Sequence, residues 1–166
     1  MKKLKYLKGT ECAAASDEDI ENFRRRTGIA DPAQDFLDYC KNDNGGVPAS
    51  ENEYFKPSLL CHDYWEFCGN RVINSAGEID VGKLLGLHDE GRFSIYKWTN
   101  NARTVWHLSD EYFVVAYDGI GSTIVSKLLA GDSRVFFWEP HVEPHFFMIA
   151  ERLAEFYSNL VPSDQV

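Results

Sequence analysis

The sequence predicts an α+β fold in which helices and antiparallel strands occupy separate parts of the chain. Two helical patterns lie near the start, three strand patterns joined by short turns follow residue 111, and a helical pattern closes the chain. Segregated helices and strands are typical of α+β proteins. With 166 residues, 44% of them hydrophobic, the chain is expected to form a single domain over 1–166, with a core at about 16–160 and flanking segments at 1–12 and 161–166.

The first predicted helix starts after Ser16. A serine followed by three acidic residues is typical of a capped helix N-terminus, where acidic groups favour the helix dipole. Ile20 and Phe23 fall on one face of this helix, Glu21 lies four residues before a basic partner, Arg25, and Gly28 is expected to end it.

The second predicted helix is expected to start with Asp31 as its cap and Pro32 at its first position. Apolar residues then recur at helical spacing from Phe36 to Cys40, which places them on a buried face. The Cys40 thiol is therefore expected to be an inert part of the core.

Two glycine-containing segments are predicted to be structural turns. Asn44, Gly45 and Gly46 end the second helix with residues that tolerate positive φ, so they are expected to reverse the chain towards the sheet. Gly119 and Gly121 follow a strand pattern without the further glycine or lysine of a phosphate loop, and they are likewise expected to form a turn.

The middle of the chain is predicted to contain short elements. Residues 53–56, 65–67 and 71–73 are candidate strands, and Asp80 is expected to cap a short helix that reaches Leu85. A further helix is predicted where Ile95, Trp98 and Ala102 share one face.

The last part of the chain is predicted to be a three-stranded antiparallel meander followed by a helix. The strands are expected at 112–117, 123–128 and 134–138, because each is a compact apolar or alternating run that ends at a turn. An amphipathic helix is expected from Phe146 to Leu160.

The charge balance is acidic and restricts the class of partner. The net charge is −9, and because four of the basic residues are lysines within the first eight positions, the remaining chain carries −13. Such a surface repels nucleic acid and anionic membranes, so neither is an expected partner. It favours a basic protein partner, and the chain itself is expected to be a monomer or a weak homodimer.

Neither an export signal nor a membrane span is expected from the apolar pattern, which predicts a cytoplasmic protein with reduced cysteines at 12, 40, 61 and 68. The cysteine spacings do not match a zinc site, and the prolines around His141 and His145 argue against a metal-binding helix, so no cofactor is expected. No set of residues matches a catalytic motif, so the chain is predicted not to be an enzyme. A hydrolase that uses Cys61 or His141 remains an alternative.

Two segments in which acidic and aromatic residues alternate are the candidate partner-binding site. One interpretation is that they are half-buried strands with rings inside and acids outside. The other is that tyrosine and tryptophan anchors lie within an acidic rim that binds a basic partner. The candidate residues are Glu51, Glu53, Tyr54, Asp63, Tyr64, Trp65 and Glu66.

The chain resembles the SUKH superfamily, the Smi/Knr-like domain, over about residues 16–160. In the N-terminal half the resemblance is carried by Ile20, Phe23, Gly28, Pro32, Asp35, Phe36, Tyr39, Cys40, Asn44, Gly45 and Gly46. In the C-terminal half it is carried by Leu108 with Asp110 and Glu111, by 113–119, by 135–138 and by Ile149, Ala150 and Phe156.

This resemblance implies a non-catalytic α+β domain. Bacterial members mostly act as immunity proteins that bind and block a cognate toxin, often a nuclease, whereas other members are regulatory or adaptor scaffolds. The acidic body agrees with the first role, because nuclease toxins are commonly basic. The prediction is therefore a bacterial immunity protein, with a regulatory scaffold as the alternative.

Overall fold

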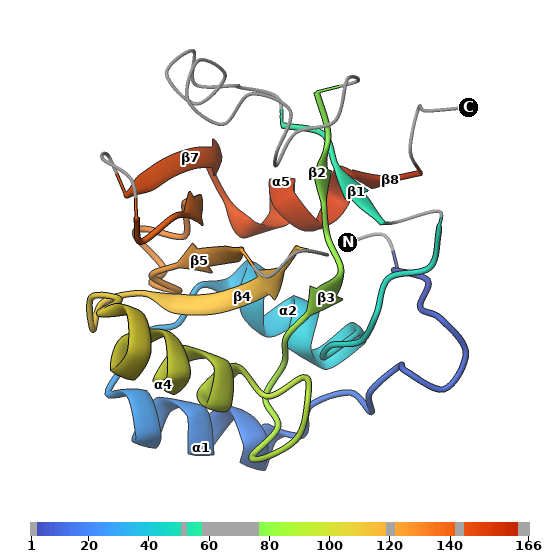
Figure 1. Ribbon diagram of the computed structural model, residues 1–166. Coiled ribbons are helices and arrows are strands. Elements are labelled where there is room, and N and C mark those ends of the chain that lie inside the picture. Colours follow the sequence, from blue (N-terminus) through green and yellow to red (C-terminus); the bar gives the residue numbers. More distant parts are fainter. Residues whose placement is uncertain (1–2, 51–52, 58–76, 119–121, 142–144, 163–166) are drawn as a thin grey trace.

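The computed structural model describes residues 3–50, 53–57, 77–118, 122–141 and 145–162, and it has an α+β fold (Figure 1). A five-stranded antiparallel sheet has the order β3-β4-β5-β6-β7, and a three-stranded antiparallel sheet has the order β2-β1-β8. The four described helices are α1 (Asp17–Thr27), α2 (Gln34–Asn42), α4 (Ile95–Trp106) and α5 (Leu153–Ser158). The larger sheet consists of β3 (Lys83–Leu84), β4 (Phe113–Tyr117), β5 (Thr123–Ser126), β6 (Val135–Trp138) and β7 (Phe146–Ala150). The smaller sheet consists of β1 (Tyr54–Phe55), β2 (Ile79–Asp80) and β8 (Leu160–Val161).

Helix α1 forms where the sequence predicts it. The Ser16 hydroxyl accepts from the Asp19 N–H and the Asp19 carboxylate accepts from the Ser16 N–H, which completes a capping box. Gly28 ends the helix in the left-handed conformation at φ 72°. Ile20 and Phe23 are both buried, but Glu21 pairs with Arg24 at i,i+3 instead of with Arg25.

Helix α2 starts later than the sequence predicts. Its N-cap is Ala33, so Asp31 is not the cap and Pro32 is not the first helical residue. The reason is tertiary: the Ala33 N–H donates to the Leu128 carbonyl, and Pro32 forms a β-bridge with Leu129. This contact with the end of β5 holds the chain extended until Gln34.

The predicted meander is present as β4, β5 and β6, and the structure extends it by one strand on each side. Asp80 does not cap a helix, because Ile79–Asp80 is β2 and Lys83–Leu84 is β3, paired with β1 and β4 respectively. Residues 53–56 contain the predicted strand as β1, whereas the candidate strands at 65–67 and 71–73 lie outside the described residues.

The predicted helix from Phe146 to Leu160 is wrong in its first half and at its last residue. Phe146–Ala150 is strand β7, which pairs with β6, the helix is limited to Leu153–Ser158, and Leu160 belongs to β8. The apolar run at 146–150 is compatible with the residue spacing of a helix and with that of a strand. Pairing with β6 makes it a strand, because this pairing buries Phe147 and Ile149 on one face of the sheet.

The core joins both sheets and all four described helices in one cluster of buried residues. Figure 1 shows α1 and α4 side by side below β4, where Phe23 contacts the rings of Tyr96 and Phe113. Helix α2 packs on α5 through Tyr39 and Tyr157, whose stacked rings lie 4.1 Å apart. The neighbouring ring on α5, Phe156, packs against Phe55 of β1, with ring centroids 5.0 Å apart.

Candidate functional site

The turn after α2 connects three parts of the chain. Asn44 adopts φ 52°, and its amide nitrogen donates to the Ala13 carbonyl at 2.9 Å while its amide oxygen accepts from the Leu87 N–H at 2.8 Å. The Asn44 carbonyl also lies 2.6 Å from His88 Nε2. These bonds hold the N-terminal segment and the chain after β3 against the end of α2.

The two glycines of this turn lie where a side chain has no room. Gly45 has φ 105° and Gly46 has φ 152°, and a Cβ at Gly46 would lie 2.5 Å from the Tyr6 ring. Gly46 also exchanges two backbone hydrogen bonds with Leu84 of β3. The other predicted turn residues, Gly119 and Gly121, lie outside the described residues.

Two of the candidate partner-binding residues, Glu53 and Tyr54, lie within the described residues. Tyr54 is in β1, the central strand of the smaller sheet, opposite Asp80 of β2 and Val161 of β8. Both Glu53 and Tyr54 are half-buried. The remaining candidates are outside the described residues, namely Glu51, Asp63, Tyr64, Trp65 and Glu66.

Three carboxylates act electrostatically on the Tyr54 phenol, and one of them, Asp80, lies opposite Tyr54 in the β1–β2 pair. Burial raises the pKa of this phenol, and the negative charges of Glu53, Asp80 and Glu78 raise it further. We call Glu53, Tyr54, Glu78 and Asp80 the Tyr54 cluster. Glu78 is fully buried, whereas Asp80 is half-buried. The result is a neutral phenol on the central strand of the smaller sheet, with acidic residues beside it.

Sequence reasoning missed Glu78 and Asp80, which lie more than 20 positions from Tyr54 in the chain. Antiparallel pairing of β1 with β2 brings them to the tyrosine. The alternation of Glu78, Ile79 and Asp80 was the available signal, since a buried isoleucine between two acids is typical of a short strand.

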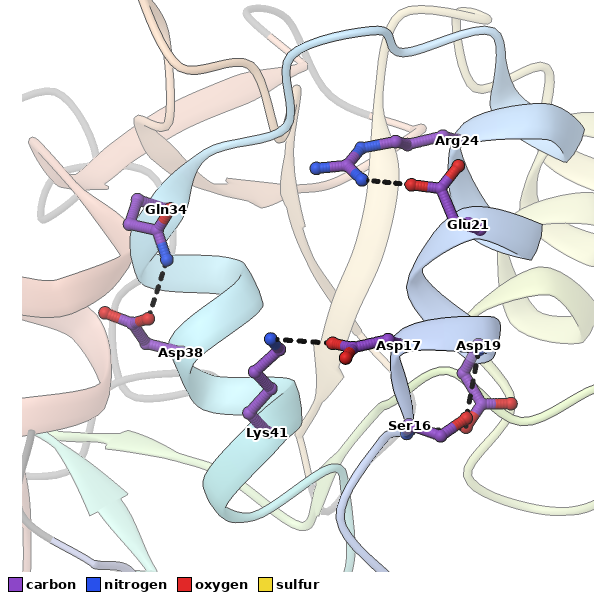
Figure 2. Close-up of polar contacts among 8 residues, drawn as sticks. All are labelled: Ser16, Asp17, Asp19, Glu21, Arg24, Gln34, Asp38 and Lys41. Atoms are coloured by element: carbon purple, nitrogen blue, oxygen red, sulfur yellow. Dashed lines mark hydrogen bonds and ion pairs between the residues drawn. The ribbon is translucent and has the colours of Figure 1, made fainter.

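A second acidic surface lies on α1 and α2. Figure 2 shows the Lys41 ammonium of α2 reaching the Asp17 carboxylate of α1, at 2.9 Å, across the space between the two helices. The other pairs in this view are local: Ser16 with Asp19 at the start of α1, Glu21 with Arg24, and Gln34 with Asp38. The first turn of α1 carries Asp17, Glu18 and Asp19, of which Asp17 and Glu18 are exposed.

The described thiols are poorly suited to nucleophilic chemistry. Cys40 is fully buried in α2, and burial raises its pKa well above that of an ordinary thiol. Cys12 is half-buried, and burial raises its pKa as well. Cys61, the cysteine of the hydrolase alternative, and Cys68 lie outside the described residues.

His141, the other candidate of that alternative, lies in an aromatic environment. Its ring contacts the Trp106 ring edge-on, with centroids 5.2 Å apart. Among the residues that the structure describes, no group of three or more His, Cys, Asp or Glu side chains is placed to hold a metal ion.

A pocket of about 220 Å³ opens beside His141. Its walls come from α4, from β4 and β5, and from the end of β6 with the residues that follow it. They comprise Ala102, Trp106, Tyr117, Ser122, Thr123, Trp138, Glu139, Pro140 and His141. Sequence reasoning did not predict this pocket, because its aromatic residues come from separate elements.

No protein-family model matches the chain, and no curated protein matches its sequence. The SUKH resemblance therefore stays a prediction that depends on the residues quoted for it. In the described part of the chain, no helix has the length and apolar character needed to span a membrane.

Proposed function

We propose that this chain is a SUKH-like, non-catalytic binding protein that neutralises a basic toxin, a nuclease in particular, by covering it with an acidic surface. The observation that supports this most directly is the Tyr54 cluster, where the pairing of β1 with β2 sets the half-buried Asp80 opposite Tyr54 and next to Glu53. The charge of −13 beyond residue 8 supports the same kind of partner.

An aromatic side chain and the negative charge around it each favour binding of a basic partner. Tyrosine is favoured in interface hot spots because its ring contributes large contact area while its hydroxyl stays hydrogen-bonded. Carboxylates around it attract lysine and arginine, which accelerates association and orients the partner. A nuclease surface that binds phosphates is basic, so an acidic protein competes for that surface.

The test pairs the chain with the product of a neighbouring toxin gene. Co-expression is expected to protect cells, and the purified proteins are expected to form a complex whose Kd rises steeply with salt. Replacing both Glu53 and Tyr54, as Glu53→Lys with Tyr54→Ala, is expected to weaken binding at least about tenfold, a loss of about 1.4 kcal/mol.

Glu90→Lys is the matched control, since it makes the same charge change at an exposed position in the loop between β3 and α4. It is expected to change the Kd less than threefold. Absence of both a complex and protection would reject the immunity role. Capture of a cellular enzyme in place of a toxin would support the regulatory-scaffold alternative.

A further inference from the structure

The pocket beside His141 has the composition of a cation-binding site. Three of the residues that line it are aromatic, namely Trp106, Tyr117 and Trp138, and the acidic residue Glu139 is also part of its lining. The faces of aromatic rings attract cations, and tryptophan does so most strongly. Neither lysine nor arginine is among the described residues that line it.

The neighbouring contacts hold these groups in place. Trp138 is 4% exposed, and its carbonyl accepts from the Thr123 hydroxyl across the β5–β6 pair. The Glu139 N–H donates to the His145 carbonyl at 2.9 Å, which fixes the backbone at the end of β6. Trp106 is 42% exposed and is in contact with the His141 ring.

The volume limits what the pocket holds. Pockets for drug-sized ligands measure about 300–1,000 Å³, and at about 220 Å³ this pocket suits one long side chain. A guanidinium fits better than an ammonium, because its flat face stacks on rings while its edge donates to a carboxylate.

We propose that this pocket binds an arginine side chain of the basic partner, stacked against Trp106 and paired with Glu139, with Trp138 beside it in the lining of the pocket. The inference rests on the proposed function for the source of the arginine. It adds a second contact to that of the Tyr54 cluster. The pocket selects a single residue type, whereas the Tyr54 cluster selects only for charge.

The experiment uses the full chain without any partner. N-acetyl-arginine methylamide is titrated into the protein while the indole N–H signals of Trp106 and Trp138 are followed by NMR. Saturable shifts of both signals are expected. The neutral citrulline analogue, which has the same shape, is expected to bind at least tenfold more weakly, and the lysine analogue at least threefold.

Two variants test the site itself. Trp106→Ala and Glu139→Gln are each expected to weaken arginine binding at least fivefold, as read from the remaining Trp138 signal. The matched control is Val105→Ala, an exposed neighbour on α4 that does not line the pocket, and it is expected to bind as the unaltered protein does.

Three outcomes would overturn the proposal: equal binding of arginine and citrulline, arginine binding that survives both variants, or shifts spread over the acidic surface without saturation at the two indoles. Because no toxin is present, loss of this site is distinguishable from failure of the immunity role. A complex and protection that persist without arginine binding would reject the pocket alone.

Discussion

Single residues decide how closely the chain segments approach one another around Asn44. Gly86 is the clearest case, because a Cβ there would lie 2.1 Å from the Asn44 carbonyl oxygen. That atom belongs to the backbone, and Asn44 is itself held by Ala13 and Leu87. The space between the two chain segments is therefore available only to glycine.

Gly86→Ala is expected to lower the free energy of unfolding by about 3 kcal/mol or more, the upper part of the usual range for overpacking, because backbone must move. Urea denaturation followed by circular dichroism measures this. Gly131→Ala is the control, since a Cβ there meets nothing within 4 Å. Equal stability of the two variants would contradict the close approach.

The Asp132 carboxylate gives a residue-scale prediction about pH. Two hydrogen bonds from the Arg134 guanidinium, each 2.8 Å long, lower its pKa to about 2. A carboxyl group whose pKa is lowered on folding stabilises the folded state above its unfolded pKa, and this contribution disappears as the pH falls towards the folded value.

The unaltered protein should therefore lose stability between about pH 4, the ordinary aspartate pKa, and about pH 2, the folded value. Asp132→Asn should be less stable at pH 6 and should converge with the unaltered protein near pH 2. Thermal melts at several pH values measure the difference. A constant difference between the two proteins across this range would show that the charge on Asp132 is not responsible.

At the scale of elements, α5 depends on a side chain from α2. Arg152, the N-cap of α5, makes no side-chain capping bond, but the Asp35 carboxylate accepts from the Ala154 N–H at 2.9 Å. The Ser133 hydroxyl also donates to the same carboxylate oxygen. One carboxylate thus joins α2, α5 and the turn before β6.

Asp35→Ala is expected to lower the free energy of unfolding by about 1–2 kcal/mol, the usual cost of a lost helix cap. Asp38→Ala, at an exposed position on the same helix, removes only the contact with Gln34 and should cost about 0.5 kcal/mol or less. Chemical denaturation of both variants measures the two losses in free energy of unfolding. Equal losses would contradict the capping role of Asp35.

At the scale of the whole molecule, the dominant feature is the excess of acids. The net charge of −9 produces repulsion that opposes compaction, and the described ion pairs, such as Lys41 with Asp17, lie mainly at exposed positions where they contribute little. Added salt should therefore stabilise this protein.

The Tm at pH 7 is expected to rise by roughly 2–4 °C between 10 and 200 mM NaCl, the shift produced by about 1 kcal/mol in a chain of this size. Calorimetry measures it. Glu90→Lys should raise the Tm at low salt and reduce the increase in Tm that added NaCl produces. A Tm that falls with salt would show that the exposed ion pairs outweigh the repulsion.

Local signals in the sequence determined the N-terminal helices and the central strands. Ser16 and Gly28 mark the ends of α1 because capping bonds form between near neighbours. The β4 to β6 strands were recognisable because each is a compact apolar run that ends at a turn. For the candidate site, the same reasoning found Glu53 and Tyr54 but not their neighbours on β2.

Tertiary structure determined the features that depend on pairing between residues far apart in the chain. Residues 146–150 fit a helix or a strand equally well until β6 lies beside them, and Asp80 is an acid of the Tyr54 cluster only because β2 pairs with β1. The aromatic pocket likewise needs α4, β4 and β6 together. Composition alone determined the acidic net charge. The fold was needed to place Asp80 opposite Tyr54 and to bring Trp106, Tyr117, Trp138 and Glu139 to one pocket, because periodicity records only neighbours along the chain.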